Sequence, residues 1–493
     1  MSKQIARLTF LTVFLPIFAS CVAVGPDYRR PDVITPTGWN SETNTQTPAL
    51  ADWWKKLNDP VLNQLIADAI ADNTSVADAR AKVRQARAEL VSAGGNAFPS
   101  LNGTASYTRS DVTSSNISGK TALDFNTKWE IDLFGGNRRG IEAAYYHVES
   151  ATERLRAALV TLIGDIAKNY AQLRGVQAKI SIAQQNSVLQ DRTVVLTRAR
   201  LQAGQISQVD LLSAQTQAAS TRSQIPELRI SYAFYLNNLT VLTGNSAIVL
   251  ATKLDIAKPV PDVPRKTPAG LPATLLFNRP DLRAAEREYA ASTARIGQAE
   301  ANLYPGISLS GNISTGGKNF GDLARLSTIG WSFGPSLSIP VFQGGKLNAA
   351  VDAAKAARDQ SFIAYRKAVL TALSEVENAS VALNQNRLRY DQLQKIASNS
   401  RKINQLTLEQ FKVGSKSFVE VLNAQTALLN SETDLGQFHT DLVLNYITLQ
   451  KALGGGWDGQ IDAKSPEVID GYTGPHIVIP AIPPSPANGT RLP

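Results

Sequence analysis

The sequence predicts a mixed α and β membrane protein, in which two similar halves each contribute two strands and two long helices. Three observations lead to this fold class. Sequence motifs recur in the same order about 210 residues apart. Proline is absent between Pro99 and Pro226 and again between Pro340 and Pro466. Around the start of each proline-poor stretch, apolar and polar residues alternate with the period of two that is typical of a strand.

The composition excludes several classes of protein. Of the 493 residues, 18% are charged and 43% are hydrophobic, which fits neither a disordered chain nor a polytopic helical membrane protein. The single cysteine allows no intramolecular disulfide, and the three histidines are scattered, so we expect no cofactor and no metal site. The net charge of +9 comes from lysines and arginines spread along the helical stretches, so we expect solvated faces and no nucleic-acid partner.

The N-terminus has the features of a secretory signal over residues 1–20. Lys3 and Arg7 precede a short apolar stretch, and small residues precede Cys21. That stretch is too short for a helix that spans a membrane. We expect cleavage before Cys21 and a covalent lipid on its thiol, which would anchor the chain to outer-membrane lipid. The alternative is ordinary signal cleavage beside an incidental cysteine.

The two halves correspond along their length. Segments 204–216 and 414–426 match best, and each begins with a glycine. Each half also closes on a Leu-x-Gly stop. The predicted organisation is an N-terminal segment at 21–64, a first repeat at 65–244, a linker at 245–268, a second repeat at 269–455 and a tail at 456–493.

Long helices are expected in the two proline-poor stretches. In the first, apolar residues recur every three or four positions from Ile141 to Ile180, which marks one helical face. A helix from near Arg138 to Ala203 would be roughly 100 Å long at about 1.5 Å per residue. A glycine ends each long helix, and a serine then begins a returning helix, so each half holds an antiparallel coiled-coil hairpin. The expected helices cover 136–203, 207–243, 345–413 and 417–453.

Four strands of the transmembrane type are expected ahead of the long helices. Trp129 and Trp331 lie in segments where apolar residues alternate with polar ones. Strands of about ten residues with one apolar face fit a membrane barrel. A soluble sandwich with one wet face is the alternative. The strands are predicted at 101–112, 122–134, 305–316 and 328–341.

Four strands cannot close a membrane barrel, because the smallest barrels have about eight. Open sheet edges are not tolerated in lipid, so copies of the chain must pool their strands. Two copies would give eight strands with a filled interior, whereas three would give twelve and leave room for a pore. An oligomer is therefore expected, and three copies are favoured.

The sequence resembles the TolC-like outer membrane factors, and most closely their lipoprotein (NodT-type) branch. Residues 24–31 resemble the opening of that branch after its cysteine. Residues 129–135 and 279–282 resemble two further signatures of the family. The similarity covers nearly the whole mature chain. It implies a homotrimer in the outer membrane with a twelve-stranded barrel, a twelve-helix periplasmic α-barrel and an equatorial belt.

The resemblance also implies a function. The chain would be the passive exit duct of a tripartite efflux system for small toxic compounds, and it would not be an enzyme. Its partners would be a periplasmic adaptor and an inner-membrane pump of the RND type. A protein-secretion duct and a periplasmic scaffold without a pore remain as alternatives. The sequence contains no recognisable nucleophile–base set or phosphate loop.

Site residues follow from the same resemblance, at the closed iris where the helical tunnel ends. They would otherwise be solvated residues at helix ends, where exposed pairs contribute little. Asparagine stands at one pore position where aspartate is common in the family. The resemblance assigns Gly204 and Gly414 to the helix-tip turns, Glu420 and Asn423 to the pore constriction, and Asp210 and Lys416 to links between helices.

Overall fold

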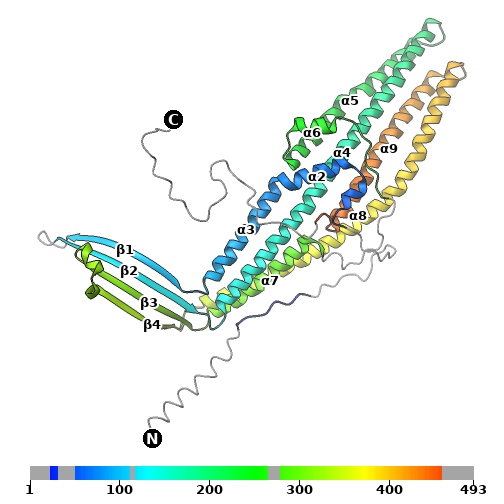
Figure 1. The fold of residues 1–493 in the computed structure, drawn as a ribbon. Coiled ribbons are helices and arrows are strands. Elements are labelled where there is room, and N and C mark those ends of the chain that lie inside the picture. The colour runs from blue at the N-terminus through cyan, green and yellow to red at the C-terminus, as the bar shows by residue number, and fades with distance from the viewer. Residues whose placement is uncertain (1–22, 32–49, 112–116, 265–277, 458–493) are drawn as a thin grey trace, which may run out of the picture.

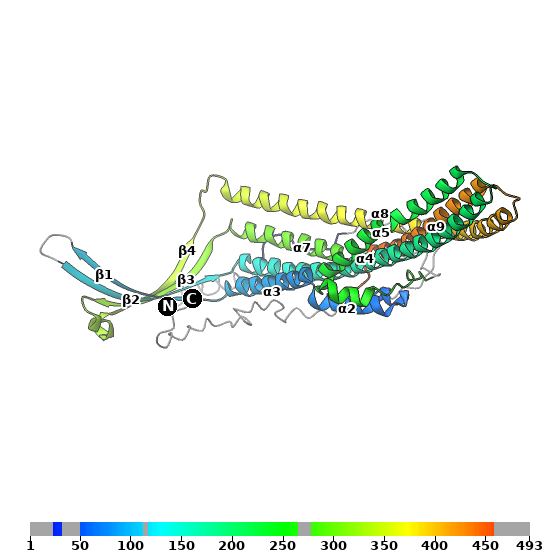
Figure 2. The same cartoon turned by 90° about the horizontal axis from the view of Figure 1, so that it is seen from above.

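The computed structural model describes residues 23–31, 50–111, 117–264 and 278–457. These residues form an elongated molecule with a sheet at one end and two helical hairpins that run to the other end (Figures 1 and 2). The predicted signal, Cys21 and most of the predicted tail lie outside the described residues.

One antiparallel sheet holds the four strands in chain order. Its fold class is the one predicted, although the second strand begins five residues earlier than expected and the second and fourth strands each end three residues earlier. The second strand ends at Ile131, because the Asp132 side chain accepts the backbone N–H of Arg138 at 2.9 Å and the chain turns into a helix. The fourth strand ends at Ser338, which lies opposite Gly306, the first residue of the third strand. The strands are β1 (Ser100–Asp111), β2 (Ile117–Ile131), β3 (Gly306–Gly317) and β4 (Ile329–Ser338).

The strand register gathers the apolar residues on one face of the sheet. Phe125 lies opposite Ile313, which in turn lies opposite Trp331. On the other face Asn126 lies opposite Asn312, and their side chains share a hydrogen bond of 2.7 Å. Because side chains alternate along a strand, this register separates an apolar face from a face of amide, hydroxyl and charged groups.

Each half then holds one very long helix and one shorter helix that returns beside it. Two helices reach 67 residues, which no compact domain requires. Pro226 lies inside one returning helix without ending it. The four helices are α4 (Gly136–Gln202), α5 (Gln208–Thr243), α8 (Lys346–Lys412) and α9 (Phe418–Ala452).

The structure adds helices that the sequence patterns did not predict. Alanine makes up much of the buried face of the helix before β3, so its apolar periodicity is weak. The additional α-helices are α2 (Pro60–Asp72), α3 (Thr74–Gly95), α6 (Ala247–Leu254) and α7 (Pro280–Ala301). Short 3-10 turns occur at η2 (Trp53–Leu57), η4 (Phe320–Ala324) and η5 (Leu326–Thr328).

Two of these helices continue the returning helices end to end. Asn73, the N-cap of α3, donates its side-chain N–H to the Leu242 carbonyl at the end of α5, at 2.8 Å. Arg279, the N-cap of α7, donates to the Ala452 carbonyl at the end of α9, also at 2.8 Å. The two halves thus build the same joint with different side chains.

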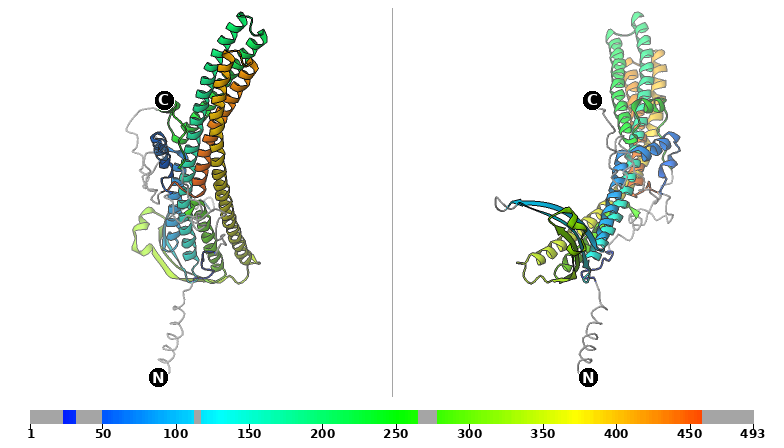
Figure 3. Two further views of the ribbon diagram at one scale, coloured as in Figure 1. Left: turned by 90° about the vertical axis from the view of Figure 1, so that its right-hand side faces the viewer. Right: turned by 60° about the vertical axis from the view of Figure 1, so that its left-hand side comes forward.

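The helices form a layer with two open edges (Figure 3). Toward the tips, α4 packs between α5 and α9, and α8 packs on α9. Near the sheet, α4 packs between α3 and α7, and α8 packs on α7. One edge therefore carries α5, α3 and β1, and the other carries α8 and β4. The main core lies between these edges, around the α4 residues from Leu155 to Leu173.

Candidate functional site

The two helix tips share one construction. Gly204 follows α4 with φ of +69°, and Gly414 follows α8 with φ of +84°. Nothing lies within 4 Å of a Cβ built at either position, so left-handed backbone geometry, rather than limited space, favours glycine. Ser207 and Ser417 then begin α5 and α9 through capping boxes. The predicted tip glycines therefore lie at the two turns.

Glu420 carries a fixed negative charge at the second tip. Lys416 donates to its carboxylate at 2.5 Å, and the backbone N–H of Ser417 donates to the other oxygen at 2.9 Å. These hydrogen bonds, that of Lys416 foremost, lower the pKa of Glu420 to about 2. The side chain remains 42% exposed. Asn423 is also exposed and lies three positions further, so the two residues share one side of α9.

The structure does not join Asp210 to Lys416 within one chain. The Asp210 carboxylate accepts hydrogen bonds from the backbone and hydroxyl of Ser207, at 3.0 and 2.8 Å. Lys416 forms an ion pair with Glu420 at its own tip. Each residue therefore stabilises its own helix start.

A contact between the two tips was missed by the sequence analysis. Arg200, near the end of α4, donates to the Lys412 carbonyl at the end of α8, at 2.8 Å. Its guanidinium lies 4.4 Å from the ring centre of Phe411. A basic residue in a last helical turn usually signals an interaction with its own helix end, so the sequence gives no sign of this crossing.

A small apolar cluster lies beneath this contact. Its buried members come from α5, α8 and α9, and partly buried residues of α4 pack on it. The four helices are thereby held together at the tips. We call this set the tip cluster; its buried residues are Ala214, Phe411, Phe418 and Val421.

The apolar face of the sheet remains open. Trp331 is 79% exposed, Phe333 is 67% exposed and Leu337 is 60% exposed. In a soluble sandwich such residues would form the buried core. Contiguous exposed apolar surface of this kind marks contact with a membrane or a partner. The sandwich alternative is therefore wrong for this sheet.

The described residues contain no helix long and apolar enough to cross a bilayer. Among the same residues, no group of three or more histidine, cysteine, aspartate or glutamate side chains is arranged to hold a metal ion.

The segment just after Cys21 is fixed where the sheet meets the helices. The Val24 N–H donates to the Phe134 carbonyl at 3.0 Å, between β2 and α4. Arg139, only 5% exposed, donates to the Val24 carbonyl at 3.1 Å and to Asp27 at 2.7 Å. We call residues 23–31 the N-terminal strap. It places Val24, three residues after Cys21, at the end of the sheet that adjoins the helices.

Comparison with known proteins decides the family. The model described as "Outer membrane efflux protein" matches residues 65–245 and 271–455, which are most of the chain and both of its halves. The chain belongs to the outer membrane efflux protein family. The matched ranges lie close to the two repeats predicted from the internal similarity.

Similar proteins extend along nearly the whole chain. Nodulation protein T of Rhizobium leguminosarum bv. viciae is 31% identical, covering 90% of this chain and 92% of that protein. The toluene efflux pump outer membrane protein TtgI of Pseudomonas putida is 29% identical, covering 90% and 98%. The outer-membrane channel OprN is similar in structure, with a TM-score of 0.79 at 31% identity, covering 88% and 99%.

Membership of this family confirms several predictions. The chain is the outer-membrane channel component of a tripartite efflux system, and it is not an enzyme. It lies in the outer membrane and extends into the periplasm. The scaffold without a pore is thereby excluded as its role.

Proposed function

We propose that three copies of this efflux protein close head to tail into one continuous duct. The observation that carries the proposal is the pair of open edges. The described sheet ends in β1 on one side and in β4 on the other. Unpaired strand edges are not tolerated in lipid, so β1 of one copy must pair with β4 of the next. A heterologous contact of this kind generates a ring when its rotation closes, and a membrane barrel requires that closure.

Exposed apolar residues support the same seam along the helices. On α5, Val241 is 76% exposed and Phe234 is 59% exposed. On α8, Val381 is 51% exposed and Leu388 is 62% exposed. Val241 and Val381 lie at similar distances along their helices from the tip glycines, as do Phe234 and Leu388. The two stripes can therefore meet when α8 of one copy packs on α5 of the next.

Three copies fit a pore better than two. Each chain brings four strands, so two copies would form an eight-stranded barrel. Side chains fill the interior of a barrel of that size. Twelve strands leave an open interior, here lined by the polar face that carries Asn126 and Asn312. The four long helices and two end-to-end extensions of each chain would continue this pore as a tunnel.

The duct would be passive and would carry small toxic compounds. A proton-driven pump of the RND type would supply the energy, and a periplasmic adaptor would connect the pump to the tips. The similarity to a toluene efflux protein supports this class of cargo. We also propose that docking of the adaptor opens a constriction at the tips.

Glu420 and Asn423 are proposed to narrow that constriction. Three symmetric copies would form a ring of carboxylates, which binds cations and reduces the bore. The ionised, exposed carboxylate of Glu420 supports this role. A link from Asp210 of one copy to Lys416 of the next is proposed for the closed state, in addition to their contacts within the chain.

Lipidation of Cys21 is proposed as a second attachment to the membrane. The N-terminal strap supports it, because Arg139 holds residues 24 and 27 beside the end of β2. An acyl chain two residues before Ala23 could then enter the bilayer next to the barrel.

The seam is tested with a double variant, Val241→Cys with Val381→Cys. Oxidation should give a ladder of covalent species that stops at three chains, because each seam joins one cysteine of each kind. The matched controls are the two single variants, which should stay monomeric under denaturing conditions. A ladder that stops at two, or cross-linking by either single variant, would contradict the head-to-tail trimer.

A further inference from the structure

The core of the long hairpins changes character along α4. Between Leu155 and Leu173 its buried face is almost entirely apolar. Toward the tip the buried positions become polar, at two to three percent exposure for Asn186, Gln190 and Thr193. Thr197 follows and is fully buried. We call the part of the hairpins beyond Ala183, Pro226, Ala397 and Gly436 the distal segment.

Only some of these buried polar groups have partners. Asn186 donates to Glu432 of α9 at 3.0 Å, and Thr193 accepts from Gln425 of α9 at 2.7 Å. Gln190, which lies between them, has no partner for either side-chain polar atom among the described residues. A buried amide without hydrogen bonds destabilises the packing that encloses it. The arrangement of the distal segment described by the structure is therefore held weakly at its centre.

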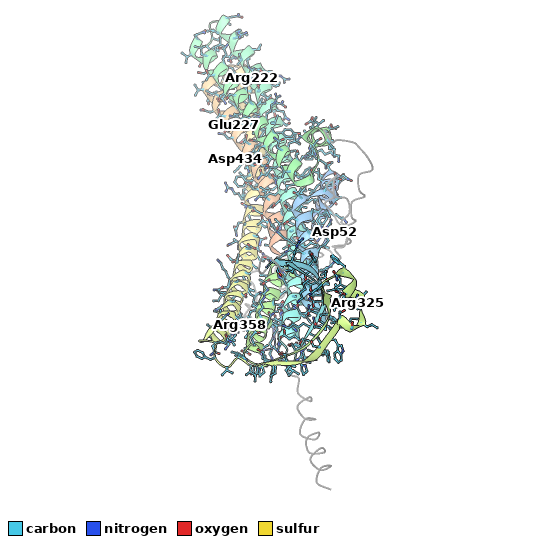
Figure 4. All side chains as sticks on the ribbon, turned by 90° about the vertical axis from the view of Figure 1, so that its left-hand side faces the viewer. Asp52, Arg222, Glu227, Arg325, Arg358 and Asp434 are labelled. Atoms are coloured by element: carbon cyan, nitrogen blue, oxygen red, sulfur yellow. The ribbon has the colours of Figure 1, made fainter. Side chains whose placement is uncertain are left out.

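Both returning helices carry a residue of low helix preference where the distal segment begins. Pro226 in α5 has no N–H, so the helix lacks one hydrogen bond at that turn. Gly436 lies in the interior of α9, at the position of the second repeat that corresponds to Pro226. Each hairpin therefore has a residue of low helix preference in its returning helix. Figure 4 labels Arg222 and Glu227 on either side of Pro226, and Asp434 just before Gly436, in the part of the molecule toward the tips.

Packing does not require either residue. A Cβ built at Gly436 would meet its nearest neighbour, Ile182, at 3.4 Å, which is an ordinary contact. Pro226 is exposed. Gly175 provides the contrast, because a Cβ there would lie 2.4 Å from the Thr440 hydroxyl. The helices α4 and α9 are thus locked together at Gly175, and a helix-weakening glycine follows one turn beyond Thr440 on α9.

The tips themselves are joined, so the four helices of the distal segment bend together, and the packing between α4 and α9 around Gln190 must shift as they bend. The tip cluster draws residues from all four helices, and Arg200 connects the ends of α4 and α8. When two packed antiparallel helices bend together, the helix on the outer side of the bend follows a longer path than the helix on the inner side. The long helices α4 and α8 can curve smoothly, and the weakened turns at Pro226 in α5 and Gly436 in α9 absorb the difference.

We propose that Gln190, Pro226 and Gly436 are positioning residues for opening of the tunnel: they keep the closed distal segment weak enough to swing outward. This inference rests on the proposed function, because it needs a constriction at the tips that opens. It leads to an unusual expectation, since variants that stabilise the distal segment should impair the channel.

The test uses Gln190→Leu and Gly436→Ala in the full-length protein. Hydrogen exchange should slow in the distal segment of both variants. The ratio of open to closed time in a planar bilayer should fall for Gly436→Ala by about fivefold for each chain that must open, given the helix preference of alanine over glycine. The current through a single open channel and the native mass should not change. Gln184→Leu, the same change at an exposed position of α4, is the matched control and should alter neither readout.

The outcomes separate the two proposals. If the wild-type protein conducts and both variants slow exchange but open as often as the wild type, the positioning role is wrong. If either variant opens more often while its exchange slows, the role is wrong as well. If the purified wild-type protein never conducts, the proposed duct itself fails and this inference fails with it. Should Gln190→Leu not fold, Gln190→Met and Gly436→Ala provide the same comparison.

Discussion

At the scale of single residues, the tips show how a short motif fixes a charge. Glu420 sits at the third position of α9, where it caps the helix start and pairs with Lys416. Both contacts favour the ionised carboxylate, which is why its pKa is lowered to about 2. Asp210 occupies the matching position of α5 and caps that helix in the same way.

This charge leads to a prediction about block by cations. Replacing Glu420 and Asn423 with alanine should raise the single-channel conductance and weaken cation block, because the carboxylate ring is removed. Asp78→Asn, which removes an exposed carboxylate from α3 far from the tips, should leave both unchanged. Unaltered conductance and block in the double variant would remove Glu420 from the constriction.

The lowered pKa also sets the pH dependence. The folded-state pKa of Glu420 lies below its ordinary value of 4.5, so its stabilising contribution is complete above that value and is lost as the pH falls toward 2. Cation block by wild-type protein should accordingly be constant from neutral pH down to about pH 4.5 and disappear only near pH 2. A loss of block near pH 6 would assign it to another group.

At the scale of elements, the strands and long helices were predictable because each carries a strong periodic signal. Alternation placed β2 and β4, and the steps of three and four placed α4 and α8. The helix α7 was missed because alanines such as Ala290 and Ala294 give its buried face little contrast with its surroundings. The end-to-end joint made by Arg279 could not be foreseen either, since it connects two helices that only the tertiary fold brings together.

The candidate site divides in the same way. The tip glycines and the position of Glu420 follow from local sequence, because turns and capping boxes depend on a few neighbouring residues. The contact of Arg200 with α8 depends on how two hairpins pack, and no local pattern encodes it. The same holds for Arg139, whose hydrogen bonds to Val24 and Asp27 form only when the N-terminal strap docks against α4.

The open sheet face supplies a prediction for one element. Phe333→Arg would place a charge on the lipid-facing side of β4 and should destabilise the inserted protein by about 2–4 kcal/mol near the bilayer centre. Ser332→Arg is the matched control, because Ser332 precedes Phe333 and its side chain points to the opposite, polar face. Denaturant unfolding in liposomes should show the loss only for Phe333→Arg. Equal losses in both variants would mean that neither face contacts lipid.

At the scale of the whole molecule, one chain is an incomplete ring. Its sheet, its near-sheet helices and its distal helices all leave open edges on the same two sides, with β1, α3 and α5 on one and β4 and α8 on the other. One kind of contact between neighbouring copies can therefore close both the barrel and the tunnel. The joints at Asn73 and Arg279 connect each returning helix to the helix that leads to the sheet. The tips and the barrel are therefore linked through continuous helices.

The most direct test of this account is the single-channel conductance of the purified protein in a planar bilayer, with its native mass determined in the same detergent. The account predicts a trimer that inserts and passes small currents, which divalent or trivalent cations reduce. A protein that stays monomeric and never inserts would contradict the shared barrel, and with it the continuous duct.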